Sequence, residues 1–159
     1  MRVEINMPNI QEEKFEDIIP ELEPLLIDHY HEIARNQDFV KLKPNFEQYV
    51  NLDRAGCLST VTVRDEGELV GYFITFILPN MHYQDNVLAM NDVLFLDKRL
   101  RGKIVGLKMI KYAQDVLKNK YKVQVLQIGM KLAHDFGPML ERMGYTEIER
   151  IYEIVLRRD

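Results

Sequence analysis

The segment 88–128 constrains the fold of this chain more than any other part of its sequence. Its hydrophobic pattern predicts a strand over 88–96, a glycine-bearing turn over 97–103, a helix over about 105–118 and a strand over 123–128. A helix that connects two neighbouring strands of one sheet makes a right-handed crossover, which leaves the two strands parallel. The sequence therefore predicts an α/β protein built around a βαβ unit.

Ahead of this unit, the chain begins with a predicted strand and a proline-containing helix. Residues 2–5 alternate like a strand, which residues 7–9 are expected to end. Apolar residues recur at spacings of three and four over 15–33, as they do on one face of a helix. Because proline is tolerated only in the first turn of a helix, we expect a turn ending near Pro20 and the helix proper over about 24–36.

A second helix and a hairpin are predicted between this helix and the βαβ unit. Asn45 can cap the exposed amides of a short helix over 46–55. Two runs rich in β-branched and aromatic residues, 58–63 and 69–77, flank the turn residues 65–67. These runs predict an antiparallel hairpin that leads into the strand at 88–96.

The C-terminal end of the chain is expected to complete the sheet. A last helix is predicted near 134–143, with Gly144 as its C-terminal cap, and a closing strand over 152–156. The whole pattern predicts a mixed sheet of about six to seven strands flanked by about four helices.

Composition narrows the class of protein. A chain of 159 residues has the usual size of a single domain, which we expect to span 1–159. A net charge of −4 argues against general nucleic-acid binding, and Cys57, the single cysteine, excludes an internal disulfide and a multi-cysteine zinc site. No apolar run approaches the roughly 20 residues of a membrane span. Without a secretory signal pattern either, we expect a cytoplasmic protein with no membrane partner.

The turn at 101–106 is the strongest candidate for a ligand site. A glycine-containing turn that opens a helix presents unpaired backbone amides and the positive end of the helix dipole. Such a point binds anions, most often phosphate. The chain lacks the G-x-G-x-x-G spacing of dinucleotide sites and the G-K-[ST] ending of the P-loop. A phosphate-bearing ligand of another kind is therefore expected.

This turn resembles the acyl-CoA-binding motif of the GNAT acyltransferases, [RQ]-x-x-G-x-[GA]. Arg101-Gly102-Lys103-Ile104-Val105-Gly106 matches the motif with one departure, since Ile104 replaces its middle glycine. The order of predicted elements is similar to the family over nearly the whole chain. The resemblance implies a GNAT fold with acetyl-CoA as co-substrate. It implies coenzyme contacts from the following residues: Leu94, Phe95, Leu96, Arg101, Gly102, Lys103, Ile104, Val105, Gly106 and Leu107.

Two other segments carry the resemblance. Residues 139–145 are similar to the "LYEKLGF" region of the family, with Gly144-Tyr145 as its glycine-aromatic pair. The stretch 82–85, followed by 90–95, resembles small GNAT proteins encoded by tailed bacteriophages. A bacteriophage origin is an expectation from that resemblance alone.

Asp92 is the candidate general base. In the family, a substrate amine attacks the thioester directly, which requires a group that removes a proton and donors for the developing oxyanion. Asp92 falls on the predicted fourth strand, where many relatives carry a glutamate. Strand alternation predicts that it shares a face with Leu94 and Leu96 and points into the cleft. The alternative is a structural carboxylate bonded to loop amides.

The general acid is less well defined. Many relatives use a tyrosine of the last helix to protonate the leaving thiolate, and here the aligned residue is Leu140. Tyr83 and His82 in the preceding loop, or His134 at the start of the last helix, are candidates to replace it. Each of them also has an ordinary role as a surface or capping residue.

Two functions follow from these observations. The first is an N-acetyltransferase that moves an acetyl group from acetyl-CoA to a primary amine on a small molecule, a peptide or a modified nucleotide, with no metal ion. The second is a GNAT-fold binding module without turnover that contacts a partner protein. Leu140 and Ile104 favour the second. A homodimer is compatible with either function.

Overall fold

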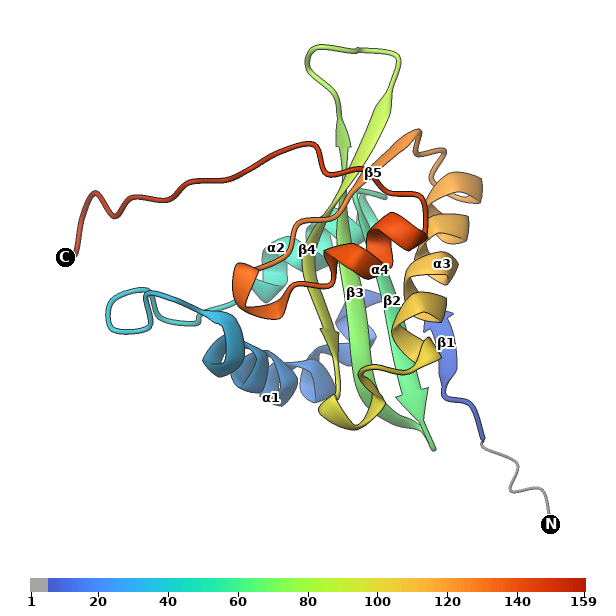
Figure 1. Cartoon of the computed structure of the whole chain (residues 1–159), viewed down its shortest axis with the longest axis horizontal. Helices are drawn as coiled ribbons and strands as arrows, with labels where there is room; N and C mark the ends of the chain where they lie inside the picture. Colours follow the sequence, from blue (N-terminus) through green and yellow to red (C-terminus); the bar gives the residue numbers. More distant parts are fainter. Residues whose placement is uncertain (1–5) are drawn as a thin grey trace.

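A five-stranded mixed sheet forms the centre of the structure, a computed structural model that describes residues 6–159 (Figure 1). The strands lie in sequence order, and the first four pair antiparallel while the fifth runs parallel to the fourth. The parallel pair confirms the predicted βαβ unit. The strands are β1 (Asn9–Glu12), β2 (Leu58–Asp65), β3 (Glu68–Pro79), β4 (Val87–Leu96) and β5 (Val125–Gln127).

Helices cover both faces of this sheet. On one face, an apolar cluster joins α1 and α2 to side chains such as Tyr72 and Phe95 of the sheet. On the other face, a second cluster packs α3 against side chains such as Phe73 and Leu96. The helices are α1 (Phe15–Ile33), α2 (Phe46–Arg54), α3 (Ile104–Asn119) and α4 (Gly137–Arg142), with 3₁₀ turns η1 (Lys98–Leu100) and η2 (Leu132–His134).

The first helix is continuous through both of its prolines, so the expected break at Pro20 is wrong. Pro20 and Pro24 lie one turn apart on the exposed side of α1, where water can satisfy the carbonyls left without an amide partner. The opposite side buries Ile18 and Leu22 completely. The Asp53 carboxylate accepts a hydrogen bond of 2.8 Å from the amide of Phe15 and caps the helix from α2. Apolar burial and this cap therefore outweigh the cost of the prolines.

Replacing Pro24 with alanine is expected to stabilise the protein. Proline in a helix interior costs about 3 kcal/mol relative to alanine, and roughly 0.4–1 kcal/mol of that is returned through its stiffening of the unfolded chain. The free energy of unfolding, measured by urea denaturation, should rise by about 2 kcal/mol. A fall in stability would contradict the exposed placement of Pro24 inside α1.

Several terminal elements differ from the sequence prediction. The strand expected over 2–5 lies outside the described residues, and β1 occupies Asn9–Glu12, beginning where a break was expected. Its register places Ile10 opposite Val63. Only one of its four residues is strongly apolar, so the sequence of this segment gives little indication of a strand. Pairing with β2 determines where the strand forms.

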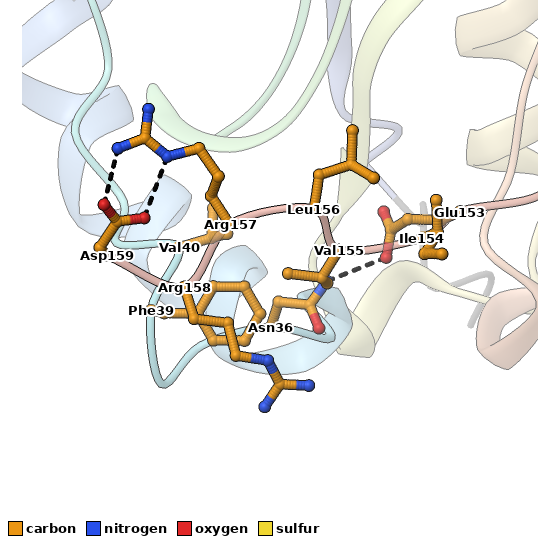
Figure 2. A pocket seen from close by; sticks show the side chains of 10 residues that line it. All are labelled: Asn36, Phe39, Val40, Glu153, Ile154, Val155, Leu156, Arg157, Arg158 and Asp159. Carbon is orange, nitrogen blue, oxygen red and sulfur yellow. Dashed lines mark hydrogen bonds and ion pairs between the residues drawn. The ribbon is translucent and has the colours of Figure 1, made fainter.

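The predicted closing strand over 152–156 is absent from the described sheet, which has five strands rather than six or seven. After α4 and the positive-φ cap Gly144, the chain runs extended away from the sheet (Figure 1). Tyr152 is 88% exposed. The tail lies along the loop after α1, where Asn36 donates a 2.9 Å hydrogen bond to Glu153, and a hollow separates the two segments (Figure 2).

Candidate active site

A β-bulge in the middle of β4 defines the site. Ile74 of β3 pairs with Val93, but the next residue of β3, Thr75, pairs with Asn91. Asp92 is therefore an extra residue without a partner on β3. Bulges of this kind bend a strand and redirect its side chains, and they are common beside active sites.

At the same point, β4 parts from β5. The parallel pairing joins only Leu88, Ala89 and Met90 of β4 to β5. Beyond the bulge, the backbone of β4 continues to pair with β3 as far as Leu96, with no fifth strand on its other side among residues 6–159. The β4 backbone over 94–96 thus has no neighbouring strand on this edge within residues 6–159, and this is where the resemblance expected the coenzyme.

The Asn91 side chain bridges the two strands where they separate. Its Nδ2 donates to the carbonyl of Gly129 at 3.0 Å, and its Oδ1 accepts from the amide of Gly129 at 2.7 Å. This pair of bonds replaces the backbone ladder that stops at Met90. Asn91 was not predicted from the sequence as a site residue; its signal is a polar Asn-Asp pair in an otherwise apolar strand.

The turn after β4 leads directly into α3. Gly102 has φ of +71°, a conformation that favours glycine, and open space surrounds it. Helix α3 begins at Ile104, so the amides of Ile104, Val105 and Gly106 have no acceptor within the helix. No side chain of the described part of the chain caps them, and the first turn contains no acidic residue. This end of α3 fits a phosphate group.

The departure from the family motif is accommodated without backbone strain. Ile104 is the first residue of α3 and does not have a positive φ, so no glycine is required there. Its side chain is 54% exposed. The isoleucine therefore lies on the outside of the turn rather than in the protein core.

Arg101 is held by α1 rather than left free at the turn. Its Nη1 and Nη2 donate to the two carboxylate oxygens of Glu32 at 2.5 and 3.0 Å, and its Nε donates to the carbonyl of Leu96 at 2.7 Å. This ion pair holds the pKa of Glu32 below its usual value. Lys103, by contrast, is exposed at the start of α3.

Asp92 points to the face opposite to the one predicted. Its Oδ2 accepts a hydrogen bond from the hydroxyl of Tyr49 on α2. Leu94 packs instead with the α3 cluster on the other face. The bulge adds one residue to the strand and so reverses the alternation on which the expectation of a shared face rested.

The environment of Asp92 suits a general base. Burial raises the pKa of its carboxyl, and the hydrogen bond from Tyr49 opposes this shift only in part. Burial, together with the neighbouring Asp92 carboxylate, also raises the pKa of Tyr49. Among residues 6–159, Tyr49 is the one hydrogen-bond partner of Asp92, so Oδ1 remains available to accept a proton. Tyr49 was not identified from the sequence.

A second buried pair lies beside this site. His29 of α1 is buried, and its Nδ1 lies 3.2 Å from the hydroxyl of Tyr72 on β3. Its ring centroid is 5.3 Å from that of Phe95. Burial lowers the pKa of His29 to about 4, so the imidazole is neutral at neutral pH. His31, two residues on, is exposed.

The candidates for the general acid are not brought together. Tyr83 lies in the exposed loop before β4, and the five strand steps from Val87 to Asp92 alone span roughly 17 Å. His134 lies in η2, after β5, with its Nδ1 3.5 Å from a carboxylate oxygen of Glu32 at the end of α1. Leu140 is buried in α4 and supplies no proton. The roles of Tyr83 and His134 stay predictions.

Elsewhere in the described chain, no second site of comparable chemistry is evident. Within residues 6–159, no three His, Cys, Asp or Glu side chains gather in a way that would hold a metal ion. None of the described helices has the length and hydrophobicity of a membrane span. The hollow of Figure 2 is lined by the C-terminal tail and by residues of the loop after α1 such as Phe39, and neither the bulge nor the turn at 101–106 contributes to it.

Comparison with solved structures identifies the fold. A ribosomal-protein-alanine N-acetyltransferase from Brucella melitensis biovar Abortus 2308 superposes with a TM-score of 0.70 at 18% identity, covering 94% of this chain and 99% of that one. An aminoglycoside acetyltransferase from a soil metagenomic sample, in complex with sisomicin, superposes with a TM-score of 0.71 at 16% identity, covering 96% of this chain and 98% of that one. Glucosamine-6-phosphate N-acetyltransferase from Arabidopsis thaliana superposes with a TM-score of 0.67 at 13% identity, covering 96% of this chain and 100% of that one.

The chain therefore has the GNAT fold, as its sequence resemblance predicted. A scan against protein-family models and a search of curated proteins each found no match. At these identities the similarity establishes the architecture.

Proposed function

We propose that this protein transfers an acetyl group from acetyl-CoA to a primary amine. The observation that carries the proposal is the convergence on one half of β4: the strand loses its β5 neighbour at the Asp92 bulge and then leads into the uncapped start of α3. An extended ligand with a phosphate-rich end fits an open strand edge followed by free helix amides. The similarity to acetyltransferases of known structure supports the same ligand.

Acetyl-CoA would supply an activated thioester at the open edge of β4. In the proposed reaction the amine nitrogen forms a bond to the carbonyl carbon, the carbon–sulfur bond breaks, and the coenzyme thiolate leaves. Asp92 accepts the proton that the amine loses, through its free Oδ1. Backbone amides over 94–96 stabilise the charge on the carbonyl oxygen. Tyr49 holds the carboxylate of Asp92 in place.

The acceptor is proposed to be an amine that is positively charged in water. The carboxylate of Asp92 is half-buried and attracts an ammonium group, which gives its first proton to water before the amine attacks the thioester. One similar structure is of an aminoglycoside acetyltransferase, another of a glucosamine-6-phosphate N-acetyltransferase. Small molecules, peptides and modified nucleotides with a primary amine all remain within the proposal.

Calorimetric titration with acetyl-CoA and with free coenzyme A tests the site. Replacing Gly106 with tryptophan should abolish saturable binding, because the indole would fill the space over the first turn of α3. Lys118→Trp, at the other end of the same helix, serves as the matched control and should bind as the wild type does. Equal binding by both variants would show that the coenzyme does not use this turn.

A binding module without turnover is the second candidate, and the burial of Leu140 favours it. The residue is 4% exposed and leaves α4 without a proton donor where many relatives have a tyrosine. A panel of primary amines, assayed for coenzyme thiol release, separates the two functions. Release that depends on an amine supports the transferase; coenzyme binding without release from any amine supports the module.

A further inference from the structure

The guanidinium of Arg101 could pair with the phosphates of the coenzyme. It is already bonded to the carboxylate of Glu32 in a bidentate ion pair. Three of the donors of Arg101 are already used, two on Glu32 and one on the Leu96 carbonyl. Glu32 also places a negative charge beside the turn that should receive phosphates. An anion-binding site usually has no carboxylate side chain beside it.

The pair links two elements that are distant in sequence. Glu32 lies in the last turn of α1 and Arg101 follows η1, 69 positions later. The Glu32 carboxylate is mostly buried, with 14% of its side chain exposed, whereas 33% of the Arg101 side chain is exposed. Glu32 is therefore the fixed partner, and Arg101 is the one with room to turn outward.

We propose that the phosphates of the coenzyme and the carboxylate of Glu32 compete for Arg101. Binding of the coenzyme draws Arg101 toward the start of α3 and leaves Glu32 ionised without its partner. An acceptor ammonium group is the kind of charge that would then pair with Glu32. The pair thus couples coenzyme binding to the uncovering of an anionic subsite, and this inference rests on the proposed function.

The surroundings of Glu32 support a carboxylate that stays ionised when Arg101 leaves. The groups facing it are the positive side chains of Arg101 and of Lys98 in η1, and the imidazole of His134 in η2 at 3.5 Å, while His29 on its own helix is neutral. Loss of Arg101 removes the largest influence that lowers the pKa of Glu32, so this pKa should rise toward its usual value. The positive charge of Lys98 remains to stabilise the ionised form.

Calorimetry on Glu32→Gln tests the competition. The variant should bind coenzyme A at least about fivefold more tightly than the wild type, the size of a typical coupling between sites. Glu16→Gln on the same helix, whose carboxylate pairs with Arg54, is the matched control and should not change the affinity. In an Arg101→Gln background, the gain from Glu32→Gln should disappear. If Glu32→Gln still tightens coenzyme binding in that background, the gain comes from removing charge repulsion by Glu32, and the proposed competition is overturned.

Carbon-13 NMR of the Glu32 carboxyl gives a second readout in the wild-type protein. Saturating coenzyme A should raise the pKa of Glu32, and methylammonium chloride, used as the amine probe, should then shift its signal only in the complex. An unchanged pKa, or unchanged or weaker binding by Glu32→Gln, overturns the competition alone. Failure of the wild type and of Glu32→Gln to bind coenzyme A would instead remove the proposed function itself.

Discussion

Replacing Asp92 with asparagine is expected to lower kcat/KM for acetyl transfer about 10²- to 10⁴-fold, the usual contribution of a general base. Asparagine keeps the shape of the side chain and can still accept a hydrogen bond from Tyr49, but it cannot take a proton. The affinity for acetyl-CoA should be unchanged, because the turn at α3 is untouched. Thiol release, measured with an accepted amine, gives the rate.

The pH dependence provides a second test of the same residue. Asp92 acts as a base only when it is ionised, and burial raises its pKa above the ordinary 3.8. The rate should therefore rise with pH through a pKa above 3.8, and this acid limb should be lost in Asp92→Asn. Asp85→Asn, in the exposed loop before β4, is the control and should retain the wild-type profile.

The loss of activity in Asp92→Asn should not come from unfolding. A carboxyl whose pKa is raised on folding holds its proton more tightly in the folded state, so its ionisation destabilises the fold. This cost appears as the pH rises above 3.8 toward the raised pKa, and it is fully present at neutral pH. Asparagine removes it, and the thermal midpoint of the variant should equal or exceed that of the wild type. A marked fall in the midpoint would make the kinetic result uninterpretable as loss of a base.

The turn proposed to bind the coenzyme could be predicted from the sequence because its signals are local. A turn that opens a helix and contains a positive-φ glycine is specified by neighbouring residues, and the structure places Gly102 and the start of α3 where the pattern put them. The strong apolar period over 105–118 fixes the helix that follows. Short-range chemistry was enough for this part of the fold.

The surroundings of Asp92 and Arg101 could not be predicted, because they depend on pairings over long distances in the chain. Tyr49 meets Asp92 across 43 positions, and Arg101 meets Glu32 across 69. The face to which Asp92 points is decided by a bulge, which exists only once β3 and β4 have chosen their register. No periodicity within β4 contains that information.

Local patterns also failed where two local rules conflicted. In α1 the prolines predict a break while the apolar stripe predicts one helix, and packing against the sheet decided for the helix. At 152–156 the apolar residues predict a strand, yet the segment lies extended beside the loop after α1. An apolar pattern predicted the observed helix or strand only where another part of the protein was present to bury its apolar side chains.

Replacing Leu22 with alanine is expected to lower the free energy of unfolding by about 2–5 kcal/mol, the cost of removing a fully buried leucine side chain. Leu22 is 0% exposed and lies in α1 between the two prolines, packed in the cluster that includes Tyr72 and Phe95. Leu132→Ala is the matched control, because that leucine is 96% exposed and its loss should change stability by less than about 0.5 kcal/mol. Urea denaturation measures both. Equal effects from the two substitutions would mean that α1 is not held to the sheet by this stripe, and Glu32 and His29, which the same helix carries, would then lose their fixed positions beside β4.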